Sequence, residues 1–166
     1  MHPEVELFVK RAYDQISYAH FPFSVVEFGS RNVNGSVRDI FKGCDYIGVD
    51  TLDGLDVDII CDAAEYTPEK PVDIVVCCET LEHTNRAHLI VANAYKILKP
   101  EGAFIMTAAM PPRLHHSMKD GTPFLEQLEY YSNIEPAALL GWSAAFKKIF
   151  LECHVDRGDI YALAFK

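Results

Sequence analysis

The chain has 166 residues, a length typical of one domain and too short for two of ordinary size. Hydrophobic residues make up 49% of it and charged residues 23%, which excludes an intrinsically disordered, collagen-like or coiled-coil chain. The formal net charge is -9. Because no run of Lys or Arg interrupts this acidic surface, tight binding to a nucleic-acid backbone is not expected.

In chain order, the hydrophobic pattern predicts eleven elements. They are a helix at 3–17, a strand at 24–29, a helix at 34–41, a strand at 45–50, a strand from 57 to near Asp62, a strand at 73–79, a helix at 84–98, a strand at 103–109, a helix within 134–145, and strands at 147–155 and 159–165. The last two strands flank an Asp-Arg-Gly turn and therefore form a hairpin. Residues 110–133 are a polar and aromatic stretch that is too long for a mere connector.

Strands that alternate with helices and are apolar on both faces indicate a parallel α/β sheet with helices on both sides. The terminal hairpin adds an antiparallel strand. The chain has no repeat, low-complexity tract or linker, so residues 1–166 are expected to form a single domain.

The five cysteines and the first residues bear on the cellular compartment. An odd number, with three inside apolar runs, predicts reduced and buried thiols. The adjacent Cys77 and Cys78 point to opposite faces of a strand, so no zinc site is expected from them, and no metal site is predicted. The first sixteen residues contain early acids and no long apolar stretch, so neither a signal peptide nor a membrane anchor is expected there. The predicted location is the cytoplasm.

The predicted ligand crevice lies at the carboxyl ends of the first three strands. Gly29 follows the first strand and allows a ligand to approach the backbone, and the next helix is expected to offer free amide groups to an anion. Asp50 ends the second strand, where a carboxylate can accept hydrogen bonds from both hydroxyls of a ribose. Asp62 ends the third, where it can meet an adenine edge. Together these residues predict a nucleoside site.

Each of these residues also has a purely structural interpretation. Gly29 is compatible with an ordinary turn, Asp50 with a solvated strand end, and Asp62 with the N-cap of the next segment. The glycine after Gly29 is Gly35, so the GxGxxG spacing of a dinucleotide site is missing. Glu27 would repel a pyrophosphate but can receive a cationic amine.

An ordered set of segments resembles the class I S-adenosylmethionine-dependent methyltransferases, in particular their small single-domain (type 11-like) group. The segments are VVEFGSRNVNGSVRDIF, YIGVD, DIICDAAEY, DIVVCCETLEHT and AYKILKPEGAFIMTAA, from Val25 to Ala109. The resemblance implies a Rossmann-like, doubly wound sheet of seven strands in which the last strand is antiparallel. It implies S-adenosyl-L-methionine as cofactor and S-adenosyl-L-homocysteine as product.

The resemblance also implies the cofactor-binding residues. Residues of the first loop would face the methionine part, the second strand end would hold the ribose, the third would border the adenine, and the fourth would lie near the transferring methyl. The implied set is Glu27, Gly29, Ser30, Arg31, Asp50, Thr51, Asp62, Ala63, Cys78 and Glu79.

Two departures from the family pattern affect the cofactor side. The segment TLDGLD leaves no room for a helix between the second and third strands, so that crossover is expected to be a loop. Arg31-Asn32-Val33-Asn34 stands where many members carry further glycines.

Methyl transfer from a sulfonium is an in-line displacement, so alignment of the reactants in a water-poor pocket is the main requirement. A general base is needed only for a protonated acceptor, and the candidate catalytic residues are Glu79, His83 and His115, with His116 as a neighbour. His83 is also compatible with a structural cap, and the two loop histidines with a solvated lid. Arg113, suited to an anionic acceptor, is a candidate recognition residue together with Tyr130, Tyr131 and Asn133.

The acceptor is predicted to be a small molecule or a modest peptide. The fourth strand ends in Cys-Cys-Glu-Thr and lacks both the Asn/Asp-Pro-Pro-aromatic and the Pro-Cys segments of nucleic-acid methyltransferases. A non-catalytic S-adenosylmethionine- or nucleoside-binding protein, such as a partner subunit, is the alternative. A small NAD-dependent oxidoreductase is the weakest candidate. The sequence gives no prediction about the oligomeric state.

Overall fold

The structure is a computed structural model that describes residues 3–16 and 21–166. Its seven-stranded sheet has the order β3-β2-β1-β4-β5-β7-β6. The strands are β1 Ser24–Phe28, β2 Asp45–Asp50, β3 Ile59–Ile60, β4 Val72–Cys78, β5 Leu98–Ala109, β6 Lys148–His154 and β7 Asp159–Phe165. Only β7 runs antiparallel to its neighbours, which confirms the predicted α/β fold class and the terminal hairpin.

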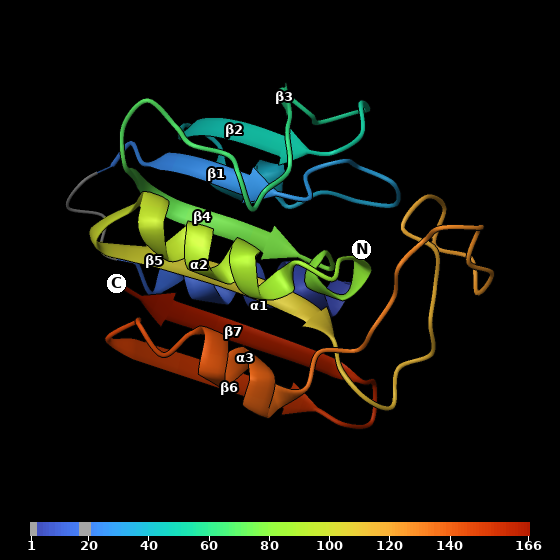
Figure 1. Cartoon of the computed structure of the whole chain (residues 1–166). Coiled ribbons are helices and arrows are strands. Elements are labelled where there is room, and N and C mark those ends of the chain that lie inside the picture. The colour runs from blue at the N-terminus through green and yellow to red at the C-terminus, as the bar shows by residue number, and fades with distance from the viewer. Residues whose placement is uncertain (1–2, 17–20) are drawn as a thin grey trace.

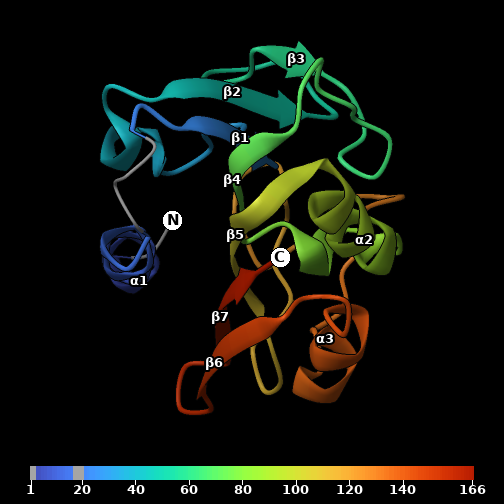
Figure 2. The same ribbon diagram turned by 90° about the vertical axis from the view of Figure 1, so that its left-hand side faces the viewer.

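Helices cover both faces of the sheet, as the apolar character of the strands predicted (Figures 1 and 2). Helix α1, Pro3–Asp14, packs on one face, and α2, Ala87–Ile97, and α3, Pro136–Trp142, lie on the other. The predicted end of the first helix at Ser17 lies outside the described residues. Two core clusters result, and the adjacent Cys77 and Cys78 belong to different ones, on opposite faces.

The predicted helix at 34–41 is wrong for most of its length. Only a short 3₁₀ turn forms, η2, Arg38–Phe41. Asn32 Oδ1 accepts a hydrogen bond from the Gly35 amide at 2.9 Å, and Ser36 Oγ accepts one from the Arg38 amide at 3.1 Å. Such local side-chain bonds compete with the backbone pattern of a helix, so the segment remains an irregular loop.

The third strand is much shorter than predicted, because polar side chains take its backbone partners. Asp58 Oδ2 accepts the Gly48 amide at 2.7 Å, which ends pairing with β2 on one side. Asp62 Oδ1 accepts the Ala64 amide at 2.8 Å and starts a turn on the other. The crossover from β2 is a loop, as TLDGLD predicted, and it leaves Ile59 and Ile60 exposed.

Around the fourth and fifth strands, the predicted boundaries shift. Helix α2 begins at Ala87 and not at 84, and a 3₁₀ turn, η3, Leu81–His83, precedes it. Strand β5 begins directly at Leu98, so the 99–102 segment belongs to the strand, with an irregular register opposite Val72. No helix in the described part of the chain is long and apolar enough to span a membrane.

Residues 110–133 form a long loop without helix or strand. The loop leaves the carboxyl end of β5 and extends beyond the strand ends before α3 brings the chain back to the sheet (Figure 1). It therefore stands at the edge where a parallel sheet binds its ligands.

Candidate active site

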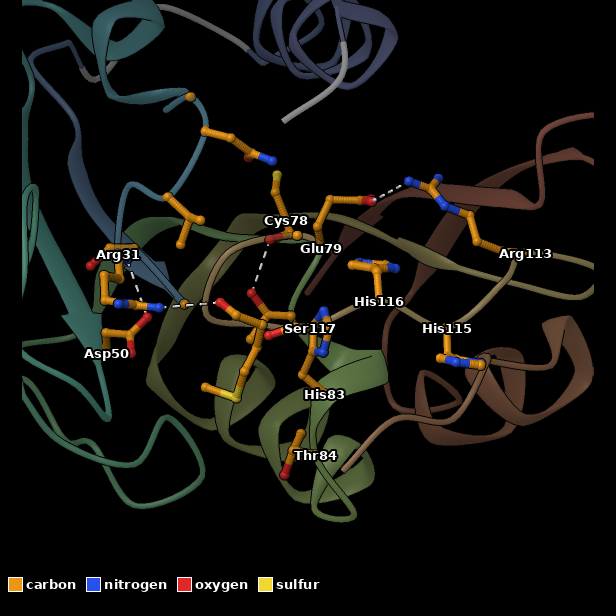
Figure 3. A pocket seen from close by; sticks show the side chains of 18 of the residues that line it. Arg31, Asp50, Cys78, Glu79, His83, Thr84, Arg113, His115, His116 and Ser117 are labelled. Atoms are coloured by element: carbon orange, nitrogen blue, oxygen red, sulfur yellow. Dashed lines mark hydrogen bonds and ion pairs between the residues drawn. The ribbon is translucent and has the colours of Figure 1, made fainter. Parts of the chain in front are cut away.

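One cavity of about 590 Å³ opens at the carboxyl ends of β1, β2 and β4. All twelve predicted site residues line it: Glu27, Gly29, Ser30, Arg31, Asp50, Thr51, Asp62, Ala63, Cys78, Glu79, His83 and His115. Figure 3 shows Arg31 and Asp50 at one end, His115 and Arg113 at the other, and Cys78, Glu79, His83 and His116 between them. The topology thus brings together residues that are up to 88 positions apart in the chain (115 − 27).

Glu27 is buried at the end of β1, with 3% of its surface exposed. Tyr46 on β2 donates a hydrogen bond to its Oε2 at 2.8 Å. Burial raises the pKa of Glu27 to about 7, although the Tyr46 hydrogen bond opposes this rise. Within the part of the chain that the structure describes, no ion pair to Glu27 forms, so this buried carboxylate is well suited to an ammonium group on a ligand.

Position 29 requires glycine for two reasons, its backbone conformation and the lack of space for a side chain. Its φ is +75°, and a Cβ atom there would lie 2.0 Å from Thr80 Oγ1. The amides of Gly29 and Ser30 both donate to Val49 O, and the Asn32 amide donates to Leu55 O. These loop amides are therefore not open to an anion, and the next helix, whose first amides were expected to be free, forms only as the short η2 turn.

Asp50 ends β2 and faces the cavity. Its Oδ2 accepts the Arg31 amide at 3.1 Å, and its Oδ1 accepts the Leu52 amide at 3.0 Å. Each carboxylate oxygen has a second lone pair, so the group can still accept two hydroxyl donors. The two amides fix the orientation of the carboxylate, which is what recognition of a vicinal diol requires.

Asp62 Oδ1 accepts the Ala64 amide and starts a turn, so its local role resembles the N-cap of its structural interpretation, but residues 63–65 form a turn and not a helix. Its Oδ2 forms an ion pair with Arg86, a residue that the sequence reasoning missed. Asn93, buried on α2, was also missed; its Nδ2 donates to Ala63 O at 2.7 Å and to Tyr66 O at 2.8 Å. The sequence did contain a signal for Asn93, because this polar residue lies on the otherwise apolar face of the predicted helix.

Cys78 and Glu79 end β4 in the middle of the cavity. Burial raises the pKa of the Cys78 thiol well above its usual value, so it stays protonated and is no nucleophile. Glu79 has a φ of +50°, a strained conformation for a residue with a side chain. Thr107 Oγ1 donates to its Oε1 at 3.0 Å.

Arg113 does not present a free charge to an acceptor, contrary to the expectation that it would bind an anion. Its guanidinium forms a buried ion pair with Asp159 on β7 and lies 3.8 Å from Glu79 Oε2. The cation is therefore already neutralised by acids on two strands.

His83 lies on η3 at the far end of the cavity. Its ring packs against His116 at 4.9 Å and against Tyr131 at 5.4 Å between centroids. Burial lowers the pKa of His83 to about 4, with His116 as a further cause, so the imidazole is neutral at physiological pH. His115 lies at the exposed rim of the same cavity.

Glu82 is a fully buried acid that the sequence reasoning did not select. Its Oε1 accepts the Ala109 amide at 3.0 Å, at the end of β5. Burial raises its pKa to about 8, and the neighbouring Glu79 adds to the rise. The sequence contained a signal for Glu82, which lies in the segment Leu81-Glu82-His83 between a predicted strand and a predicted helix. A charged residue that is buried at such a position needs a specific partner.

The loop at 110–133 closes one side of the cavity with residues 112–118, 121 and 123. Arg31 Nη2 donates to Met118 O at 3.2 Å and to Lys119 O at 3.3 Å, which ties this loop to the loop after β1. Tyr130 and Asn133 line a separate, smaller depression, and Tyr131 lines neither hollow. Of the four predicted recognition residues, only Arg113 lines the main cavity.

Residues 34–106 match the family model of a methyltransferase domain. No curated protein sequence matches the chain. Among solved structures, a SAM-dependent methyltransferase from Archaeoglobus fulgidus is similar, with a TM-score of 0.66, 18% identity, and coverage of 97% of this chain and 94% of that one.

A second similar structure is the 1,6-didemethyltoxoflavin-N1-methyltransferase of Burkholderia thailandensis, solved with 1,6-didemethyltoxoflavin and S-adenosylhomocysteine. Its TM-score is 0.64 at 18% identity, and 97% of this chain and 79% of that chain are covered. The N-methyltransferase NodS of Bradyrhizobium japonicum, in complex with S-adenosylhomocysteine, has a TM-score of 0.63 at 11% identity, with coverages of 98% and 87%.

The match of residues 34–106 to a methyltransferase domain, and the fold that the chain shares with these structures, agree with the predicted class, the small class I S-adenosylmethionine-dependent methyltransferases. The matched segment, residues 34–106, supports methyl transfer as the activity, and the neighbours solved with S-adenosylhomocysteine support S-adenosylmethionine as the cofactor.

Proposed function

We propose that the chain transfers the methyl group of S-adenosylmethionine to a small-molecule acceptor that enters between η3 and the 110–133 loop. The observation that carries this proposal is the shared cavity, in which Glu27, Gly29 and Asp50 line one half and His83 and His116 the other. One half fits an amino-acid nucleoside, and the other has room and polar groups for a second reactant.

In the cofactor half, the binding groups follow the order of the cofactor's ammonium group, methionine chain, ribose and adenine. Glu27 would accept the ammonium group, Gly29 leaves space for the methionine chain, and Asp50 would accept the ribose hydroxyls. Ala63, held in place by Asn93, would border the adenine. The sulfonium would then lie beside Cys78 and Glu79, at the centre of the cavity.

Methyl transfer breaks the S–CH₃ bond, whose electron pair stays on sulfur, and forms a bond from an acceptor lone pair to the methyl carbon. The protein aligns the three atoms and limits access of water through the 110–133 loop. Glu79 and His83 are the proposed groups to take a proton from an acceptor that arrives protonated, because both face this half of the cavity. His115 at the rim would contact the acceptor.

The acidic net charge supports the proposal that no nucleic acid is bound. The single seven-stranded sheet supports the proposal that residues 1–166 act as one domain. We also propose that the protein works in the cytoplasm. Five cysteines without a disulfide in the structure fit a reducing compartment.

Calorimetric titration with S-adenosylhomocysteine tests the cofactor half. Asp50→Ala is expected to weaken binding about 100-fold, since a charged acceptor of two hydroxyl hydrogen bonds is removed at about 1.5 kcal/mol each. Asp53→Ala is the matched control, because Asp53 is an exposed acid three residues away that does not line the cavity. Equal affinity of both variants would overturn the proposed site.

Turnover separates the enzyme from the alternative of a non-catalytic binding protein. Methyl-labelled S-adenosylmethionine, incubated with the protein and a pool of small metabolites, is expected to yield a labelled product. Tight binding of S-adenosylhomocysteine without any labelled product from diverse pools would favour the binding protein instead.

A further inference from the structure

Three potential ligand groups converge at the acceptor end of the cavity. A carboxylate oxygen of Glu82 and one imidazole nitrogen each of His83 and His116 lie within 4.8 Å of one another. They come from η3 and from the 110–133 loop, 33 residues apart (116 − 83). Figure 3 shows the two imidazoles side by side below Glu79 and Arg113.

Two atoms of this cluster are buried without a hydrogen-bond partner among the described residues. They are Glu82 Oε2, on a side chain with 0% exposure, and His83 Nδ1. Leaving a buried carboxylate oxygen unpaired costs on the order of 1–3 kcal/mol or more. The other oxygen, Oε1, is held by the Ala109 amide, so Glu82 is kept in this orientation.

The surrounding charges favour a cation as the missing partner. Three carboxylates, Glu79, Glu82 and Asp159, face two guanidinium groups, Arg113 and Arg157. Both guanidinium groups are engaged by Asp159, and only Arg113 also approaches Glu79. No ion pair to Glu82 forms among the described residues, and a cation that binds there would displace the proton of this carboxyl.

We propose that Glu82, His83 and His116 bind a divalent transition-metal cation, with zinc as the chemically preferred ion, in the acceptor half of the cavity. Two imidazoles and one carboxylate form a ligand set that zinc and its neighbours prefer, whereas magnesium and calcium prefer oxygen ligands alone. Three protein ligands leave a fourth position open, as in catalytic and not in structural zinc sites.

The geometry requires only a small adjustment. Ligand atoms at about 2 Å from a tetrahedral zinc ion lie about 3.3 Å apart. The observed spacing of up to 4.8 Å therefore has to contract by about 1.5 Å at most. Rotation of His116 can supply this, since it lies in a loop and not in a regular element.

His83 and His116 line the cavity, so an acceptor oxygen or nitrogen that enters it could become the fourth ligand. A cation lowers the pKa of a bound hydroxyl or amine, whose proton then leaves to solvent. The resulting lone pair attacks the methyl carbon, and the sulfur keeps the electrons of the broken bond. This acceptor role rests on the proposed methyl transfer, whereas binding of the cation does not.

The test is a titration of the metal-free protein with Co²⁺ alone. Binding is measured by the visible d–d absorption of the bound ion. We expect binding of one equivalent, and displacement by one equivalent of Zn²⁺. His116→Ala is expected to weaken Co²⁺ binding at least 100-fold, and His115→Ala, the adjacent histidine outside the cluster, by no more than about twofold. Glu82→Gln should also lose the signal, provided that its far-ultraviolet circular dichroism shows a folded chain.

Equal Co²⁺ affinity of the His116→Ala and His115→Ala proteins, or no stoichiometric binding by the unmodified chain, would overturn the proposed metal site. Binding of S-adenosylhomocysteine, measured on the same preparations, is expected to persist in His116→Ala. Its retention separates failure of the metal site from failure of the proposed cofactor site.

Discussion

The titration of Glu27 predicts how cofactor affinity depends on pH. Burial raises the pKa of this carboxyl from 4.5 to about 7, so in the empty protein about half of it is protonated at pH 7. Only the carboxylate can pair with the ammonium group of S-adenosylhomocysteine. Affinity should therefore rise with pH and level off above the pKa of Glu27.

The magnitude follows from the ionised fraction. This fraction is about one half at pH 7, about one eleventh at pH 6 and about one hundredth at pH 5. The dissociation constant should thus increase about fivefold from pH 7 to pH 6, and about tenfold more at pH 5. Calorimetric titration with S-adenosylhomocysteine in buffers of constant ionic strength between pH 5 and 7.5 measures this profile.

Two variants isolate the group responsible. Glu27→Gln should bind weakly and with a flat profile over the same range. Tyr46→Phe removes the hydrogen bond that opposes the rise in pKa, so its profile should shift to higher pH. A wild-type profile that is flat, or one that survives Glu27→Gln, would refute the assignment of Glu27 to the ammonium group.

The same pKa predicts the effect of pH on stability. Because the pKa of Glu27 is raised in the folded state, the folded protein holds this proton more tightly, and stability is lost as pH rises from 4.5 to about 7. The loss amounts to about 3 kcal/mol, from 2.5 pH units at ~1.4 kcal/mol each. Glu27→Gln should therefore be more stable than wild type at pH 8 by up to this amount in urea denaturation, and similar at pH 4.

Two further substitutions test the frame of the site. Gly29→Ala should destabilise the protein by about 2–5 kcal/mol, because the φ angle of Gly29 is positive and the new Cβ would overlap Thr80. Gly141→Ala on α3 is the control. A Cβ at Gly141 meets nothing within 4 Å, so this substitution should be neutral or stabilising by up to about 1 kcal/mol. Asn93→Ala should cost about 2–4 kcal/mol, because two buried carbonyl groups lose their donor, and should weaken S-adenosylhomocysteine binding as well. Thermal and urea denaturation measure the stabilities, and a Gly29→Ala protein as stable as wild type would contradict the first argument.

Most of the fold could be predicted from hydrophobic patterning, since the elements with the clearest periods, such as β2 and the β6–β7 hairpin, lie where the pattern placed them. The failures share one physical cause. At the segments 34–41 and 57–62, short polar side chains bond to nearby backbone groups and replace helix or strand bonds. Such bonds depend on which loop lies opposite, and the local pattern does not contain this information.

Some residues of the site could likewise be predicted from the sequence, and others could not. Residues at strand ends, such as Asp50, could be placed because parallel strands bring their carboxyl ends to one edge whatever the details of packing. The partners of Asp62 and Arg113 could not, because ion pairs between distant elements depend on the path of the loops. From position alone, the Asp62 carboxylate was expected to be open to a ligand and the Arg113 guanidinium to be free for an anion.

The acceptor half shows why such partners decide function. Glu82 is only one residue from His83, yet its role depends on Ala109 and His116, which the sheet and the 110–133 loop bring to it. The same loop carries His116 to the cluster and bonds to Arg31 beside Asp50. Order in this loop therefore affects both halves of the cavity at once, and a substitution that frees it from Arg31 should weaken the cofactor and the cation together.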